Sequence, residues 1–173
     1  FEIEGKRAEG MDYYGLDADK KTILIIGGSL GARTLNQAME ASTALIESHP
    51  EVQILWQCGK FYFESYQSGK AAQLPQVKIK AFLDKMDLAY AVADVVISRA
   101  GALSVSELCL VGKASILVPS PNVAEDHQTK NALALVKENA AILVRDVEAM
   151  SGMLRKAYEI LADPALKLQL ETQ

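Results

Sequence analysis

The chain has 173 residues, half of them hydrophobic and 23% charged, which is the composition of one folded domain with a full core. Its net charge of −4 argues against a nucleic-acid partner, because an acidic surface repels phosphate backbones. No apolar run approaches the roughly 18 residues of a membrane-spanning helix. Cys58 and Cys109 lie in apolar stretches, where buried free thiols are expected in a reducing compartment.

Strand-like and helix-like segments alternate after residues 1–21, a polar segment that we interpret as a linker or a lead into the domain. Short apolar runs predict strands at 22–27, 52–59, 94–101, 114–119 and 140–145, and the alternating segment 77–83 predicts another. Helical spacing with glycine or proline stops predicts helices at 32–47, 60–73, 85–92, 102–112, 125–138 and 147–161, and a short one after Asp163-Pro164. The alternation predicts one α/β domain over 22–173. Its fold is Rossmann-like, with a doubly wound parallel sheet in the order 3-2-1-4-5-6.

In such a sheet the functional site lies beyond the carboxyl ends of the strands, near the point where the strand order reverses. The first candidate loop there reads GGSLGAR, residues 27–33. Gly27 and Gly28 allow a tight turn close to a ligand, Ser29 adds a hydroxyl, and the start of the next helix suits a phosphate. The alternative is a plain strand-to-helix turn with a serine cap. The loop fits neither the dinucleotide fingerprint nor the P-loop, which disfavours nicotinamide and ATP enzymes.

The second candidate loop reads SRAGALSVSE, residues 98–107. Three backbone N–H groups open the following helix toward an anion, those of Ala102, Leu103 and Ser104. The Glu107 carboxylate can accept two hydrogen bonds from adjacent hydroxyls, such as those of a ribose. Arg99 either bridges to a phosphate or pairs with a nearby acid. The alternative for Ser104 and Glu107 is helix capping or a solvated face.

The third candidate loop reads PSPNVAEDHQTKNA, residues 119–132. His127, Gln128 and Asn131 share a helical face, and their amide and imidazole groups suit sugar hydroxyls. The alternative for His127 is a cap or a surface position.

Together these loops resemble the C-terminal domain of the MurG family of peptidoglycan glycosyltransferases, over about Thr22 to Asp146. The stretch AFLDKMDLAYAVAD, residues 81–94, is also similar to that family. The resemblance implies one half of a GT-B enzyme, the half that binds UDP-GlcNAc, with the N-terminal acceptor domain absent. It implies transfer of N-acetylglucosamine to lipid I, giving lipid II, at the cytoplasmic face of the bacterial plasma membrane as a peripheral protein.

The same resemblance implies roles for individual residues. The diphosphate is met by Gly28, Ser29 and Gly31. The backbone of Leu83 recognises uracil, and Met86 lies against the nucleoside. The phosphate and ribose region is lined by Ala102, Leu103 and Ser104. Glu107 holds the ribose hydroxyls. The donor sugar is faced by His127, Gln128 and Asn131.

The reaction implied is a single inverting displacement without cofactor or metal, whose base lies in the absent domain. This chain alone is therefore expected to bind the donor without transferring sugar. Two other functions stay open. One is a different GT-B glycosyltransferase that uses another nucleotide sugar, and the other is a non-catalytic domain that binds nucleotide sugars.

Overall fold

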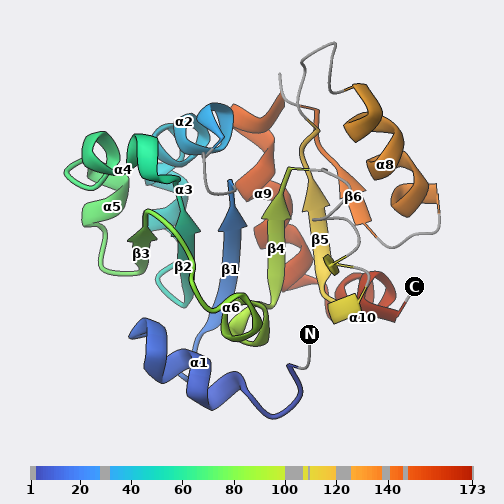
Figure 1. Ribbon diagram of the computed structural model, residues 1–173, viewed down its shortest axis with the longest axis horizontal. Coiled ribbons are helices and arrows are strands. Elements are labelled where there is room, and N and C mark those ends of the chain that lie inside the picture. Colours follow the sequence, from blue (N-terminus) through green and yellow to red (C-terminus); the bar gives the residue numbers. More distant parts are fainter. Residues whose placement is uncertain are drawn as a thin grey trace.

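A parallel sheet of six strands runs through the computed structural model of the protein in the order β3-β2-β1-β4-β5-β6 (Figure 1). The strands are β1 (Lys21–Ile26), β2 (Val52–Gln57), β3 (Val77–Lys80), β4 (Val95–Ser98), β5 (Ala114–Leu117) and β6 (Ala141–Leu143). Every neighbouring pair is parallel. The predicted strand order and the α/β, Rossmann-like class are therefore confirmed. Strand β1 has the predicted length but begins and ends one residue earlier, and the other five strands are shorter than their predicted segments.

The structure describes residues 3–27, 32–99, 107–108, 110–119, 126–137, 141–145 and 148–172, without the side chains of residues 126, 127, 131, 135, 137 and 151. The helices are α1 (Arg7–Tyr14), α2 (Arg33–Ala41), α3 (Thr43–Glu47), α4 (Lys60–Tyr66), α5 (Lys70–Gln73), α6 (Met86–Val92), α8 (Asp126–Lys137), α9 (Ala149–Ala162) and α10 (Pro164–Thr172). Residues 107, 108, 110 and 111 are also helical. Within these described ranges, no helix is long and apolar enough to cross a bilayer.

The sheet separates two hydrophobic cores, because side chains alternate between its faces along each strand. Ile23 and Ile25 of β1 pack on one face with α2, α3 and α9. Leu24 and Ile26 pack on the other face with α1 and α6. In Figure 1, α6 lies in front of the sheet and α9 behind it. Burial on both faces explains why β1, β4 and β5 are mostly apolar, each large buried side chain contributing about 1.5–3 kcal/mol, whereas β3 alternates between buried and exposed residues.

Two predicted helices are each divided into two. The segment 32–47 breaks at Ser42, whose backbone (φ −108°, ψ 16°) leaves the helical region between α2 and α3. Serine favours such breaks because its hydroxyl competes for backbone hydrogen bonds. The segment 60–73 breaks before α5 at Gly69, whose backbone is extended and lies against the Glu40 carboxylate.

Helix α1 lies within residues 1–21, which the sequence analysis interpreted as a linker or a lead into the domain. It ends at Gly15, whose φ of +66° favours glycine. Its contact with α6 is close, since a Cβ on Gly10 would lie 2.6 Å from Val92 Cγ1 and 2.8 Å from the Leu88 carbonyl oxygen. Arg7 extends the contact by donating from Nη1 to the Val92 carbonyl at 3.1 Å.

A buried hydrogen-bond network ties α2 to the end of β2. The Asn36 side chain is fully buried in α2. Its Oδ1 accepts a hydrogen bond from Trp56 Nε1 at 2.9 Å, and its Nδ2 donates to the Cys58 carbonyl at 2.9 Å. Both groups of the amide are therefore satisfied, and the start of α2 is fixed relative to the sheet.

We expect Asn36→Ala to lower the free energy of unfolding by about 2–4 kcal/mol, because it leaves the Trp56 N–H and the Cys58 carbonyl buried without this partner. Urea denaturation followed by circular dichroism measures the change. Gln73→Ala is the matched control, since the Gln73 amide makes an exposed bond to the Gln67 carbonyl. Equal stability of the two variants would contradict this account of the network.

We expect Gly10→Ala to destabilise the protein by about 1–3 kcal/mol, because the added methyl group forces α1 away from α6. The control is Gly152→Ala in α9, where no described atom lies within 4 Å of the new Cβ. There alanine should instead stabilise by about 0.5–1 kcal/mol, since it favours the helix. Thermal melts of both variants test whether their changes in stability have opposite signs. A Gly10→Ala variant that is more stable than the unmodified protein would show that α1 and α6 separate without loss of stability.

Candidate functional site

The candidate site forms where β1 and β4 lie side by side. Ile26 pairs with Ser98 at the carboxyl ends of these strands, so the first and second loops leave the sheet at adjacent points (Figure 1). This is the predicted reversal of strand order. The residues that the sequence analysis placed in these loops, Gly28, Ser29, Gly31, Ala102, Leu103 and Ser104, lie outside the described residues. Their roles stay predictions.

Helix α2 starts directly beyond the first loop. Ala32 is extended (φ −134°, ψ 109°), and the helix begins at Arg33. The first backbone N–H groups of a helix lack intrahelical acceptors and carry the positive end of its dipole. Because Asn36 fixes this first turn through Trp56 and Cys58, the end of β1 is followed by a firmly held helix start that favours an anion.

The Glu107 carboxylate is held by a tyrosine that the sequence analysis did not select. Tyr90 Oη donates to Glu107 Oε2 at 2.8 Å. Tyr90 is only 1% exposed, and Glu107 is half-buried. Burial and the neighbouring carboxylate raise the pKa of Tyr90 well above its usual range, so the phenol stays protonated and keeps donating. Glu107 therefore lies near the second loop with one oxygen anchored.

Leu83 and Met86 lie on the connection from β3 into α6. The Leu83 side chain is 2% exposed and belongs to the core on the α1 and α6 face. The side chain itself is therefore not accessible to a ligand, and the recognition of uracil by the Leu83 backbone, which the resemblance implies, stays a prediction. Met86 is the first residue of α6 and packs half-buried against the same core.

Helix α1 holds this connection at successive positions. Tyr13 Oη donates to Asp84 Oδ2 at 2.8 Å, and Tyr14 Oη donates to the Lys85 carbonyl at 3.0 Å. The Lys6 ammonium pairs with Asp87 at 2.9 Å and, by donating to it, lowers the pKa of that carboxyl group. Hydrogen bonds and an ion pair from α1 and Lys6 thus fix the position of the segment that carries Leu83 and Met86.

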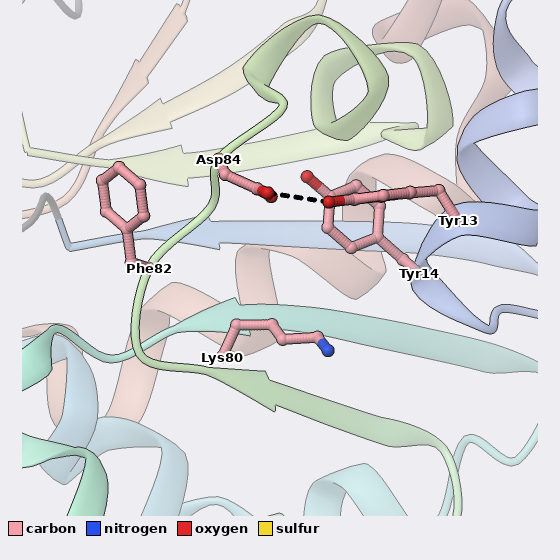
Figure 2. Close-up of a pocket in the computed structure, with 5 residues that line it drawn as sticks. All are labelled: Tyr13, Tyr14, Lys80, Phe82 and Asp84. Atoms are coloured by element: carbon pink, nitrogen blue, oxygen red, sulfur yellow. Dashed lines mark hydrogen bonds between the residues drawn. The ribbon is translucent and has the colours of Figure 1, made fainter.

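A cleft of about 510 Å³ opens beside this connection, lined by Tyr13, Tyr14, Lys80, Phe82 and Asp84. Figure 2 shows both tyrosines reaching from α1 toward Asp84, with Phe82 and Lys80 on the β3 side. Phe82 is 46% exposed, and Lys60 Nζ lies 5.0 Å from its ring centroid. Sequence reasoning missed these residues because they gather from α1, β3 and a loop, and no local motif links them.

Arg99 follows β4 and contacts the neighbouring strand end. Its Nη1 donates to the carbonyls of Val118 and Pro119 at 3.3 and 3.2 Å. These bonds tie the start of the second loop to the start of the third loop. The contact with a donor that was predicted for Arg99 stays a prediction.

The third loop leads into α8, whose range Asp126–Lys137 confirms the predicted helix at 125–138. Gln128 is half-buried near its start. The side chains of His127 and Asn131 lie outside the described set, so their grouping with Gln128 on one face stays a prediction.

Other polar residues of the region have structural roles. Asp94 accepts the Thr22 N–H at 2.8 Å and pairs with Arg7 at 3.3 Å. Cys58 is a buried free thiol, as predicted, and burial raises its pKa to about 11, which makes it a poor nucleophile. Cys109 lies outside the described residues. In the described part of the chain, no three His, Cys, Asp or Glu side chains gather as a metal site would require.

Known proteins share the sequence pattern and the fold of this chain. The model of the glycosyltransferase family 28 C-terminal domain matches residues 22–173. The UDP-N-acetylglucosamine–N-acetylmuramyl-(pentapeptide) pyrophosphoryl-undecaprenol N-acetylglucosamine transferase of Flavobacterium psychrophilum is 58% identical over 94% of this chain and 44% of its own length. The protein of the same name from Bacteroides fragilis is 52% identical over 91% of this chain and 42% of its own length. The chain therefore spans less than half the length of these curated relatives.

A solved structure gives the same result. The crystal structure of MurG from Acinetobacter baumannii superposes with a TM-score of 0.73 and 31% identity, over 94% of this chain and 47% of that chain. The resemblance inferred from the three loops is thereby confirmed. The chain belongs to the glycosyltransferase family 28 C-terminal domain family.

Proposed function

We propose that this chain binds UDP-GlcNAc as the donor half of an inverting N-acetylglucosaminyltransferase that converts lipid I to lipid II. The observation that carries the proposal is the position of Glu107. Its anchored carboxylate stands by the second loop, where the order of the strands reverses. The names of the relatives from Flavobacterium psychrophilum and Bacteroides fragilis support the choice of donor and acceptor.

The donor would lie across the carboxyl ends of β1 and β4. The glycine loop and the start of α2 hold the diphosphate, and their N–H groups stabilise the charge that develops on departing UDP. The Leu83 backbone and Met86 hold the uracil and nucleoside, while Glu107 accepts the two ribose hydroxyls. Gln128, with His127 and Asn131, faces the sugar from α8. In this proposal no residue of the chain acts as the base.

The acceptor is proposed to reach the sugar from a second domain of the complete enzyme. Proximity and orientation of donor and acceptor supply much of the rate in such displacements, roughly 7–11 kcal/mol at best. A single wall of the cleft therefore gives binding without transfer. We propose that the complete enzyme works as a peripheral protein at the cytoplasmic face of the bacterial plasma membrane, where a lipid-linked acceptor is presented.

Donor binding by this chain is the first expected outcome. Isothermal titration calorimetry should show binding of UDP and UDP-GlcNAc, and no binding of NAD. UDP-glucose separates this enzyme from one that uses another nucleotide sugar, because only a site built for the acetamido group prefers UDP-GlcNAc. Tighter binding of UDP-glucose would favour the other glycosyltransferase. Failure of both UDP sugars and UDP to bind would reject the proposal.

We expect Glu107→Ala to weaken UDP binding by about 1.5–3 kcal/mol, or about 10- to 150-fold, because a charged acceptor for two hydroxyls is lost. Glu107→Gln should show a smaller loss, since it keeps one acceptor oxygen. Calorimetry measures both variants, and thermal melts verify that they fold. The control is Glu159→Ala in α9, where the carboxylate pairs with Lys156 at 3.3 Å on the surface. Unchanged UDP affinity in folded Glu107→Ala would remove Glu107 from the site.

A further inference from the structure

We infer that Tyr90 is a positioning residue, which sets the Glu107 carboxylate for the recognition of ribose hydroxyls. The inference rests on the proposed function and adds a residue that acts through Glu107 without touching the ligand. It starts from one contact, the bond of 2.8 Å from Tyr90 Oη to Glu107 Oε2, which joins α6 to the helical last residue of the second loop.

The donor of this bond is held rigidly. Tyr90 is among the largest fully buried side chains of the protein, within the core on the α1 and α6 face. Its neighbours in α6, Leu88, Ala89, Ala91 and Val92, are buried too. A tyrosine packed in this way has no free rotamer to move to, because protein interiors are close-packed. The hydroxyl of Tyr90 is therefore a fixed point beside Glu107.

The acceptor is intrinsically mobile. A glutamate side chain rotates about several bonds, and ordering it costs free energy when a ligand binds. The bond to Tyr90 orders one carboxylate oxygen of Glu107 before the ligand arrives. A carboxylate has about four acceptor positions, so the remaining capacity still accommodates two ribose hydroxyls. The tyrosine thus lowers the cost of binding and leaves the recognition itself to Glu107.

Helix α6 gives this arrangement a second consequence. Met86 and Tyr90 are four residues apart in α6 and so share one face of it. The residue expected against the nucleoside and the residue that orients the ribose acceptor are thus carried by one short rigid element. The Lys6–Asp87 ion pair and the Tyr14 bond to the Lys85 carbonyl hold that element from α1 and from the residue just before it. We conclude that α6 sets the spacing between base recognition and ribose recognition.

The test compares UDP with 2′-deoxy-UDP by calorimetry, because ribose recognition is the readout that a merely structural tyrosine does not change. The unmodified protein should prefer UDP. Tyr90→Phe should weaken UDP binding about five- to tenfold by removing one charge-assisted bond. The same substitution should weaken the binding of 2′-deoxy-UDP less. The ratio of the affinity for UDP to the affinity for 2′-deoxy-UDP should therefore fall. Equal weakening of both ligands, or no weakening of either, would overturn the inference.

The control variant is Tyr158→Phe. Tyr158 lies in the opposite core, and its hydroxyl is buried with no hydrogen-bond partner among the described residues. It should leave both affinities unchanged. Thermal melts of Tyr90→Phe and Tyr158→Phe show whether each protein is folded at the temperature of the titration.

A double-mutant cycle gives an independent measurement. If Tyr90 acts through Glu107, Tyr90→Phe has no further effect on UDP affinity when Glu107→Ala is already present. Additive losses in the double variant would overturn the inference while leaving the role of Glu107 intact. Failure of the unmodified protein to bind UDP, or to prefer it over 2′-deoxy-UDP, would instead reject ribose recognition at Glu107, and the proposed function would fail first.

Discussion

The pairing of β1 with β4 is the constraint on which the rest of the structure depends. The two strands are separated in sequence by two other strands and several helices, yet Ile23 to Ile26 pair in register with Val95 to Ser98. This pairing places the carboxyl ends of both strands side by side. From there the chain continues to one face of the sheet after β1 and to the other face after β4. Without this pairing, the loop before α2 and the loop that carries Glu107 would not leave the sheet at adjacent strand ends. The candidate site is therefore a consequence of sheet topology before any polar side chain is considered.

The sequence predicts this topology because a parallel sheet covered on both faces leaves a simple signal, short apolar runs that end on glycine or proline. The two cores on either side of Ile23 and Leu24 follow from the same signal. Helix α1 was not predicted from this pattern of apolar residues, and the reason is physical. Its closest contact with α6 is at Gly10, where the absence of a side chain makes the fit, and Met11 and Tyr14 are its only buried hydrophobic residues among Arg7–Tyr14. Close packing through glycine cannot be found by searching for hydrophobic residues.

The candidate site divides in the same way. Glu107 was predicted from the local sequence of the second loop, and Met86 was predicted from the family resemblance. Tyr90 and the tyrosines of α1 were not, because each acts through a partner on another element. From sequence alone, a buried tyrosine in an apolar helix is interpreted as a core residue. Only the structure shows the acceptor to which its hydroxyl donates. Side chains that orient a site are hidden from the sequence for this reason, whereas backbone turns that build it are visible.

The buried bond between Trp56 and Asn36 has a spectroscopic consequence. Trp56 is the single tryptophan of the chain, and its indole is fully buried while its N–H is bonded to the amide at the start of α2. Its fluorescence therefore comes from one buried environment, in which the indole is bonded to Asn36 and lies edge-on to the Tyr66 ring. A shift of α2 toward an anion would alter this environment directly, whereas a change confined to α10 would not. The protein thus carries an intrinsic optical probe at the helix that follows its glycine loop.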